Sequence, residues 1–537
     1  MAGGFLPYHE PGIVELLIII SFFFFLSLAK WVSAKVIQAG IIGQIAVGII
    51  YGVPLANILE HKWQETFVAL GYVGLILIIF EGGLGTRLDL LKQNFALSLI
   101  GATTGVIFPI GLSYLLLYLG FGYGAVETFI IGAAMSATSL GTTFAVISSA
   151  SGSVNLAQTR VGSILVSAAV IDDVSGLVML SVISDLGQLS SGGDVNLGWL
   201  IGRPIVASIG MAVVTPIVTK WIFAPFFRKF IEYHFALFDH VSNIILMILV
   251  LCAFISIAGF TGTSVLFGAF LAGVFLTYLP SKRPEGPFVV MSREEGEREA
   301  DKSPTFVHTF EKYLLSTQQY LMEPLFFSSI GFAIPFLELW TGKRIWRGVV
   351  YTLLMTFAKC IVGIWILVWQ LARERKSRPE KESHEPQGEQ GHQGEQGHQG
   401  EQGHQGEQGH QGEQGHQGEQ GQQKREENQT NPENSRDQRE KNKWSRAWLV
   451  AALLGSAMVA RGEIGLLIIE IGHNETPYVS DEGFFTGIWA ILLNTILGPV
   501  AVGLLVRFYA KEIEDGEWGA QEQSTPVSHP ETDQEVV

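Results

Sequence analysis

The chain has 537 residues, of which 48% are hydrophobic and only 16% are charged. Its mean hydropathy of +0.31 is typical of an integral membrane protein and argues against a water-soluble domain. Much of the acid behind the net charge of -15 lies in polar segments outside the apolar runs, so we expect no nucleic-acid partner.

The first apolar run, Gly12 to Leu28, has no positive region before it and no clear small-residue cleavage site, which predicts a retained span. Twelve further runs are long enough to cross about 30 Å of hydrocarbon. They fall near 35–58, 66–84, 95–119, 125–149, 158–183, 199–222, 241–259, 262–280, 319–338, 346–372, 446–471 and 484–508. The predicted fold is therefore all-α, a polytopic transmembrane helical bundle of about thirteen spans.

Lysine and arginine gather in alternate loops, which predicts the orientation of the bundle because short cytoplasmic loops carry the excess. With the N-terminus outside, most basic residues between spans fall inside, and so does the C-terminus. The exceptions are Lys343, Arg344 and Arg347, which fall outside. The acidic loop from His473 to Asp481 also falls outside and contains the glycosylation sequon Asn474-Glu475-Thr476, although this loop is short and close to the membrane.

Polar segments divide the chain into parts. Residues 1–372 form the first part of the transmembrane domain, spans 1 to 11, with a cytoplasmic connector at 281–318. An insert at 373–445 precedes the last two spans at 446–508, and 509–537 is an acidic cytoplasmic tail that we expect to be disordered.

The insert contains five tandem GEQGHQ hexamers from Gly388, followed by GEQGQQ. A chain of Gly, Gln, Glu and His cannot bury enough apolar area to offset its ordering entropy, so this cytoplasmic insert should be disordered. An expanded linker is the simplest interpretation. Weak transition-metal binding by the histidines, or a charge that responds to pH, are the alternatives.

Two adjacent carboxyl groups lie near the centre of a predicted span, in SAAVIDDVSGLV. A charge at the bilayer centre costs at least about 2.5–3.5 kcal/mol, and Asp172 and Asp173 also repel each other. At least one of them should therefore exchange protons near physiological pH. Neighbouring residues on a helix point about 100° apart, so one aspartate can face another helix while the other faces a cavity. Lys359, at matching depth in MTFAKCIVGIW, is the expected counter-ion, since a snorkelling lysine would lie near a helix end.

Two spans are predicted to be broken. The stretch GAAMSATSLGTTF, with Thr138 and Ser139, interrupts span 5, and GSAMVARGEIGLL, with Arg461 and Glu463, interrupts span 12. Unwound backbone offers carbonyl oxygens and half-helix ends for a cation, although small residues can also serve close helix packing. Spans 4–6 and 11–13 are seven apart, so the two breaks occupy matching places in an inverted repeat.

These motifs resemble the cation:proton antiporter 2 family of bacterial and fungal sodium/proton and potassium/proton exchangers. The likeness runs through IIGQIAVGIIYGVPLANIL, LGYVGLILIIFEGGL, SATS, AAVIDDVSGL, EPLFFSSIGF, AKCIVG and MVARGEIGLLI. The resemblance implies proton exchange against Na⁺, K⁺ or Li⁺ without a cofactor, by a homodimer whose mobile domain moves the ion site past a scaffold.

Residue by residue, the resemblance implies that Asp173 binds the proton and, together with Asp172, Na⁺. Asp172 would also be the partner of the counter-ion Lys359. Thr138 and Ser139 would bind ions at the first break, with Arg461 and Glu463 supporting the second. An Asp-Asp pair with the lysine is similar to the electrogenic members. The plasma membrane is favoured, with a vacuolar or endosomal membrane as the alternative.

Other classes fit less well. An intramembrane aspartyl protease needs its two aspartates on different helices, so the chain is not expected to be an enzyme. Phe121-Gly122-Tyr123-Gly124 lacks the threonine and valine that precede these residues in a potassium-channel filter. A sodium-coupled solute symporter on the same inverted-repeat plan is the main alternative.

Overall fold

The computed structural model describes residues 10–86, 95–139, 160–189, 197–232, 239–280, 305–377, 432–514 and Trp518. Every regular element within these ranges is a helix, which confirms the all-α prediction. Residue contacts divide the chain into two units, one of Met1–Gln370 with Ser445–Val537 and one of Leu371–Trp444. Of the second unit, the described residues are the last turns of α19 (Ile364–Ser377) and the first turns of α20 (Pro432–Ala457).

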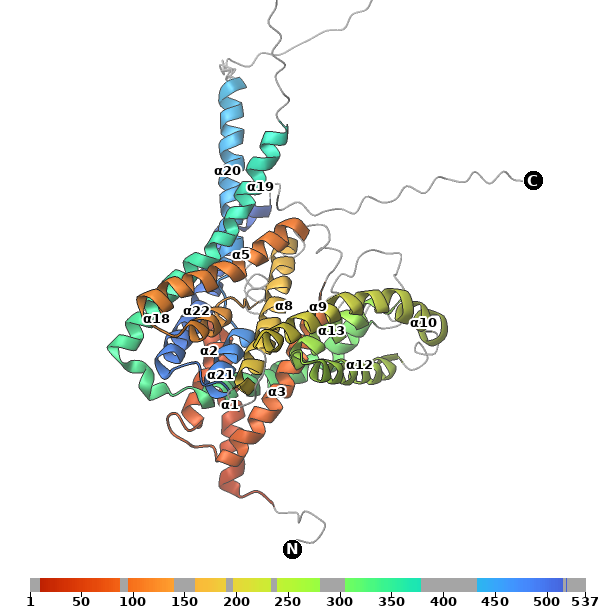
Figure 1. Cartoon of the computed structure of the whole chain (residues 1–537), viewed down its shortest axis with the longest axis vertical. Helices are drawn as coiled ribbons and strands as arrows, with labels where there is room; N and C mark the ends of the chain where they lie inside the picture. The colour runs from red at the N-terminus through yellow and green to blue at the C-terminus, as the bar shows by residue number, and fades with distance from the viewer. Residues whose placement is uncertain are drawn as a thin grey trace, which may run out of the picture. The chain divides into compact units, whose positions relative to one another are not determined.

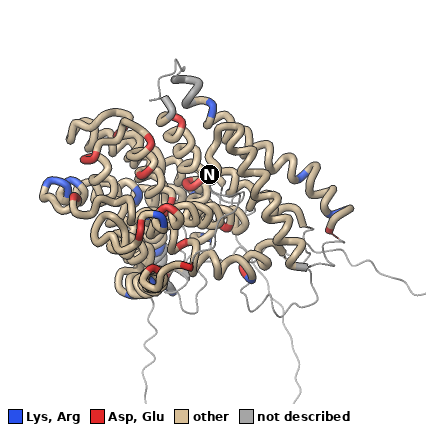
Figure 2. Tube along the Cα trace, turned by 90° about the horizontal axis from the view of Figure 1, so that it is seen from below, with Lys and Arg blue, Asp and Glu red and all other residues tan. Residues whose placement is uncertain are grey.

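Apolar helices make up most of the first unit (Figure 1). Within the described ranges, eight helical stretches are long and apolar enough to cross a membrane. Charged residues are sparse along them (Figure 2). These eight and the shorter apolar helices agree with a polytopic bundle, while the count of thirteen spans stays a prediction.

One group of helices, called here the first helix set, packs mainly within itself. It comprises α1 (Ile13–Ile37), α2 (Gly40–Tyr51), α3 (His61–Leu84), α12 (Asp239–Thr261), α13 (Val265–Tyr278) and α17 (Glu323–Ala333). Glycine allows the closest approach in this set: a Cβ at Gly48 would lie 2.1 Å from the carbonyl oxygen of Ser328, and one at Gly331 would lie 2.3 Å from that of Ile45. The backbones of α2 and α17 therefore touch, as small residues permit between membrane helices.

The remaining spans form the second helix set, which carries the predicted site. It comprises α5 (Phe95–Ser113), α6 (Ala125–Ala134), α8 (Arg160–Leu189), α18 (Gly342–Cys360), α20, α21 (Glu463–Asn474) and α22 (Asp481–Glu514). Between the two sets, α9 (Leu197–Val218) packs against both α8 and α13. Figure 1 shows α18 beside α22 in one set and α12 beside α13 in the other.

Short helical turns complete the described chain. They are η1 (Tyr114–Gly120), η3 (Thr219–Phe223), α10 (Ala224–Phe226), η4 (Phe227–Ile231), α15 (Phe306–Tyr313), α16 (Leu315–Thr317), η5 (Gln318–Met322), η6 (Phe336–Trp340) and η7 (Ile361–Gly363). Of these, α15, α16 and the start of η5 lie inside the segment 281–318 that the sequence predicts as a connector.

Both predicted helix breaks are present. Helix α6 ends at Ala134, and the chain from Ala137 to Ser139 has no regular structure. Helix α20 ends at Ala457, and α21 starts only at Glu463. The remainder of predicted span 5, including Gly141, Thr142 and Thr143, lies outside the described residues.

Ordered structure extends into the predicted insert and tail. Helices α19 and α20 each run into 373–445, and α22 continues to Glu514. Trp518 is only 3% exposed, and its carbonyl oxygen accepts a hydrogen bond from the Val161 backbone NH at 3.1 Å. The GEQGHQ repeats lie outside the described residues, so their predicted disorder stays a prediction.

The three basic residues that break the charge pattern have acidic partners. Lys343, Arg344 and Arg347 lie 3.4, 3.2 and 3.6 Å from the carboxylate of Glu482 at the start of α22. The guanidinium of Arg344 also stacks on the ring of Phe485. Their charge is therefore used to join α18 to α22, which explains why they depart from the loop statistics that predict topology.

Candidate functional site

The two adjacent aspartates on α8 have different surroundings. Asp172 is 0% exposed, whereas the side chain of Asp173 is partly exposed. This asymmetry arises because neighbouring side chains on an α-helix point about 100° apart. One carboxylate is thus held inside the protein, and the other is partly open at the protein surface.

Asp172 is paired with the lysine that the sequence analysis singles out. Lys359 on α18 is 0% exposed, and its ammonium nitrogen Nζ donates to Asp172 Oδ2 at 2.8 Å. Thr138 joins the two, because its hydroxyl donates to Asp172 Oδ2 and accepts from Lys359 Nζ at 2.9 Å. These contacts pair the two buried charges through Asp172 Oδ2, while Asp172 Oδ1 is buried without a hydrogen-bond partner. Either charge would be strongly destabilising if its partner were missing.

The two helix breaks touch each other. The backbone NH of Ser139, after α6, donates to the carbonyl oxygen of Ala460, before α21, at 2.9 Å. The Thr138 hydroxyl makes a second, longer contact of 3.4 Å with the carbonyl oxygen of Met458. The two breaks thus meet next to α8, where the inverted repeat predicts that they cross.

Charges at the breaks match the helix ends that they face. The carbonyl groups that follow the end of α6 at Ala134 lie at its partially negative end, and two buried cations reach them. Arg461 donates to the Ser136 and Ala137 carbonyl oxygens at 3.3 and 2.6 Å, and Lys359 also donates to that of Ser136. Glu463 lies in the first turn of α21, where the helix end is partially positive. The unwound backbone is therefore stabilised by charged side chains inside the protein.

Asp173 faces an acidic and polar neighbourhood. It interacts electrostatically with Glu463 and with Asp172, and Glu463 lies beside the side chain of Ser139. The buried oxygen Oδ1 of Asp173 has no hydrogen-bond partner. The described residues contain no group of three or more His, Cys, Asp or Glu suited to a metal ion. The arrangement suits a weakly held cation or a proton on one carboxylate better than a tightly bound divalent metal.

All seven residues singled out in the sequence lie in this region of the second helix set. Asp172, Thr138 and Lys359 are in direct contact, and Arg461 is joined to them through the Ser136 carbonyl. Asp173, Glu463 and Ser139 form the second, more open half of the site.

Two buried acids were missed by the sequence reasoning. Glu127, near the start of α6, accepts hydrogen bonds from the backbone NH groups of Gly124 and Ser480. Glu470 is buried within α21. The available signal for Glu470 was a lone carboxyl in the apolar run LLIIEIG, one helical heptad after Glu463.

Comparison with known proteins places this geometry in context. Residues 20–384 match the family described as sodium/hydrogen exchanger, transmembrane. The probable Na⁺/H⁺ antiporter GerT of Bacillus cereus is 27% identical over 62% of this chain and 77% of its own length. An Na⁺/H⁺ antiporter of Enterococcus hirae is 30% identical over 44% of this chain and 57% of its own. The Na⁺/H⁺-K⁺ antiporter GerN of Bacillus cereus is 25% identical over 62% and 75%.

A solved structure has a similar fold. The sodium proton antiporter MjNhaP1 of Methanocaldococcus jannaschii aligns with a TM-score of 0.50 and 16% identity, covering 92% of this chain and 98% of that chain. Separately, residues 383–430 match the collagen triple helix repeat, since glycine recurs at every third position of the hexamers. That match reflects the glycine period of the insert and does not extend to the membrane helices.

Proposed function

Because the chain belongs to the sodium/hydrogen exchanger family, we propose that it exchanges protons for a monovalent cation, Na⁺ foremost, across a membrane. The observation that carries this proposal is the pair of unlike aspartates on α8, one fixed by Lys359 and one partly exposed. The named relatives are antiporters, so they give no support to a solute symporter. The chain is an integral membrane protein that transports cations and protons.

Asp173 couples the proton to the cation because its bare carboxylate is costly inside the membrane. A bare carboxylate inside the bilayer costs at least about 2.5–3.5 kcal/mol, and a bound proton or a bound cation each removes most of that penalty. The loaded site can cross, and the empty, charged site cannot. Protons and cations therefore compete for Asp173 and move in opposite directions, which is antiport.

Asp172 and Lys359 supply the electrogenic part of the proposal. The cation is held by Asp173 with Asp172, and the oxygen atoms of Thr138 and Ser139 lie at the first helix break to complete its shell. A cation that binds Asp172 competes with the Lys359 ammonium for the same carboxylate oxygen, which favours release of a lysine proton. More than one proton would then move for each cation.

Alternating access is proposed to follow from the two helix sets. The second set carries every residue of the site, and its contacts with the first set are fewer than those within either set. Movement of the second set against the first would carry the site past a fixed barrier. We further propose a homodimer that contacts through the first set, in the plasma membrane by preference over a vacuolar or endosomal one.

The proposal is tested by reconstituting the full chain in liposomes loaded with a pH dye. A proton gradient is imposed, and lithium, sodium and potassium salts are added in turn to separate samples. Each transported cation should collapse the gradient without any organic substrate present. A gradient that no salt disturbs would refute the antiporter, and collapse only in the presence of a solute would indicate symport.

A further inference from the structure

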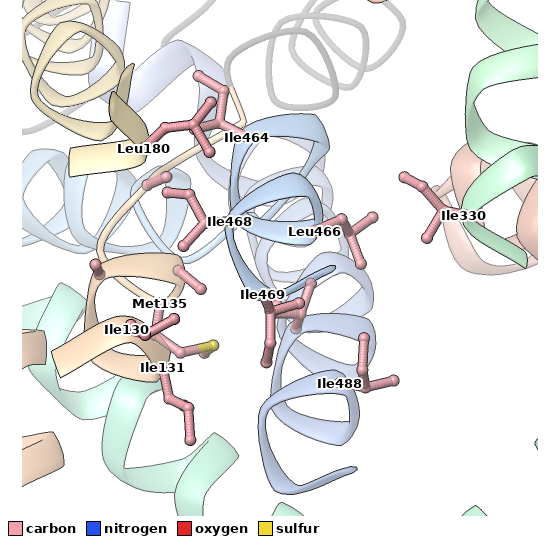
Figure 3. Packing of buried hydrophobic residues seen from close by; sticks show 14 of the residues in the cluster. Ile130, Ile131, Met135, Leu180, Ile330, Ile464, Leu466, Ile468, Ile469 and Ile488 are labelled. Carbon is pink, nitrogen blue, oxygen red and sulfur yellow. The ribbon is translucent and has the colours of Figure 1, made fainter. Parts of the chain in front are cut away.

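One face of α21, called here the polar face, carries Glu463, Glu470 and Asn474, with Leu467 between the first two, from the candidate site to the exposed end of the helix. Residues 463, 467, 470 and 474 are spaced three and four apart, so they share one side of the helix. Glu463 interacts with Asp173, and Asn474 is exposed. Figure 3 shows the flanks of this face: Ile464 and Ile468 point toward α6 and α8, whereas Leu466 points to the side on which Ile330 of α17 lies. The polar face therefore lies along the boundary between the two helix sets.

Glu470 is the buried acid on this face. It is 8% exposed, its Oε2 accepts a hydrogen bond from Asn474 Nδ2 at 3.0 Å, and its Oε1 is buried without a partner. No cation forms a salt bridge with it among the residues that the structure describes. Removing an unpaired carboxylate from water costs several kcal/mol, so this environment suits a carboxyl group that holds a proton.

Charged groups in the parts of α6, α8, α17 and α22 described above have partners other than Glu470. On α6, Glu127 binds the Ser480 backbone. On α8, Asp172 pairs with Lys359, Asp173 adjoins Glu463 and Asp185 interacts with Arg203. On α22, Glu482 pairs with Arg344 and Asp481 with His473, and on α17, Glu323 pairs with Lys30. Glu470 is thus the acid on this face that none of these pairs accounts for.

We propose that Glu470 is a proton-carrying residue of the exchange pathway, between the site at Asp173 and Glu463 and the end of the bundle at Asn474. The inference rests on the proposed proton–cation exchange. A proton leaves the Glu470 carboxyl for water at the Asn474 end, and the resulting carboxylate takes up another proton that Asp173 or Glu463 releases. A proton is favoured over a cation because Glu470 has a hydrogen bond from one amide, and the described residues place no cluster of three or more His, Cys, Asp or Glu around it.

Transfer along this face needs a change of conformation. Glu470 is seven positions after Glu463 on the helix, a rise of about 10 Å, and Leu467 lies between them on the same face. Direct transfer over that length is excluded, so water has to enter when the two helix sets separate. Glu470 would then act in one half of the cycle, at one membrane face.

The test is a sided pH profile of exchange in oriented proteoliposomes, with sodium as the probe cation. The pH on the Asn474 side is varied while the other side is held constant, and the sides are then swapped. For Glu470→Gln we expect about a tenfold loss of rate at alkaline pH on the Asn474 side and a wild-type profile on the opposite side. Glu470→Asp should recover part of the rate with a displaced profile.

Two matched variants separate proton transfer from a structural role. Asn474→Ala removes the hydrogen bond but keeps the acid, and Glu475→Gln removes an exposed carboxylate one residue away. Glu475→Gln should keep the wild-type profile, and Asn474→Ala should keep most of the rate with a displaced profile, because the acid remains but has lost its hydrogen-bond donor. A folded Glu470→Gln protein with unchanged profiles on both sides would overturn the proposal, as would equal losses in Glu470→Gln and Asn474→Ala. If Glu470→Gln does not fold, an unchanged profile in Glu470→Asp overturns it. Wild-type protein without exchange would instead overturn the proposed function.

Discussion

At the scale of single residues, neutralising Asp173 should abolish exchange, whereas neutralising Asp172 should mainly lower stability. Asp173→Asn removes the titrating group from an unpaired position, so exchange should be lost while the fold is kept. Asp172→Asn leaves Lys359 buried without its carboxylate, which should lower the free energy of unfolding by about 3–5 kcal/mol. Sodium-driven proton flux and thermal unfolding of the two variants check this, and retained flux in Asp173→Asn would contradict it.

Outside the membrane spans, Glu311 on α15 should make stability depend on pH. Burial, with a smaller contribution from Glu81, raises the pKa of Glu311 from 4.5 to about 7. The folded protein therefore binds more protons than the unfolded chain in this window, and the stabilisation is lost as pH rises from 4.5 through about 7. In thermal unfolding, Glu311→Gln should lack this fall in stability with rising pH. The control Glu512→Gln, at an exposed position, should retain it.

Residues in mid-span could be identified from the sequence because their cost is largest there. Asp172, Asp173 and Lys359 lie where a charge has no water, so composition and depth alone mark them. Glu127 and Glu470 were missed because an acid near a span end resembles one that reaches water. Only the structure shows that Glu127 is 6% and Glu470 8% exposed.

At the scale of helices, Glu127 holds two helix starts together. One carboxylate accepts from the Gly124 backbone NH before α6 and from the backbone NH and hydroxyl of Ser480 before α22. Glu127→Ala leaves these donors at the two helix starts without their acceptor, so the free energy of unfolding should fall by about 1–2 kcal/mol. Denaturant unfolding in detergent checks this. The control Glu475→Ala, at an exposed position, should change the free energy of unfolding little. Equal stability of the two variants would show that Glu127 does not stabilise the starts of α6 and α22.

Helix breaks were predictable, but ordered turns in the polar segments were not. Glycine and hydroxyl side chains in mid-span, together with Arg461 and Glu463, mark breaks that a continuous apolar helix would not contain. Helix α15 and the first turns of α20 carry the same mixed charge as a linker. Helix α15 is held by burial of Phe306 and Phe310, which are 3% and 1% exposed, and composition does not reveal a packing partner.

At the scale of the whole first unit, a hydrogen bond joins α8, which carries the two aspartates, to α13 of the first helix set. The Ser264 backbone NH, at the start of α13, donates to the Ser181 hydroxyl on α8 at 2.7 Å. Both residues lie toward the helix ends predicted to face outward. Apolar residues of α13, α17, α8 and α21 form one cluster around them. If the second set moves against the first, this contact has to open once in every cycle.

A cysteine pair at Ser181 and Ser264 should therefore stop exchange by preventing that opening. The free cysteines Cys252 and Cys360 are first replaced by serine, so that the new thiols form the intended bond. Oxidised protein in liposomes should lose sodium-driven proton flux, and a reductant should restore it, because the disulfide fixes α8 against α13. Each single cysteine variant should transport under both conditions. Full flux in the oxidised double variant, with the bond verified by gel mobility after proteolysis, would show that the two helix sets do not separate at this contact during transport.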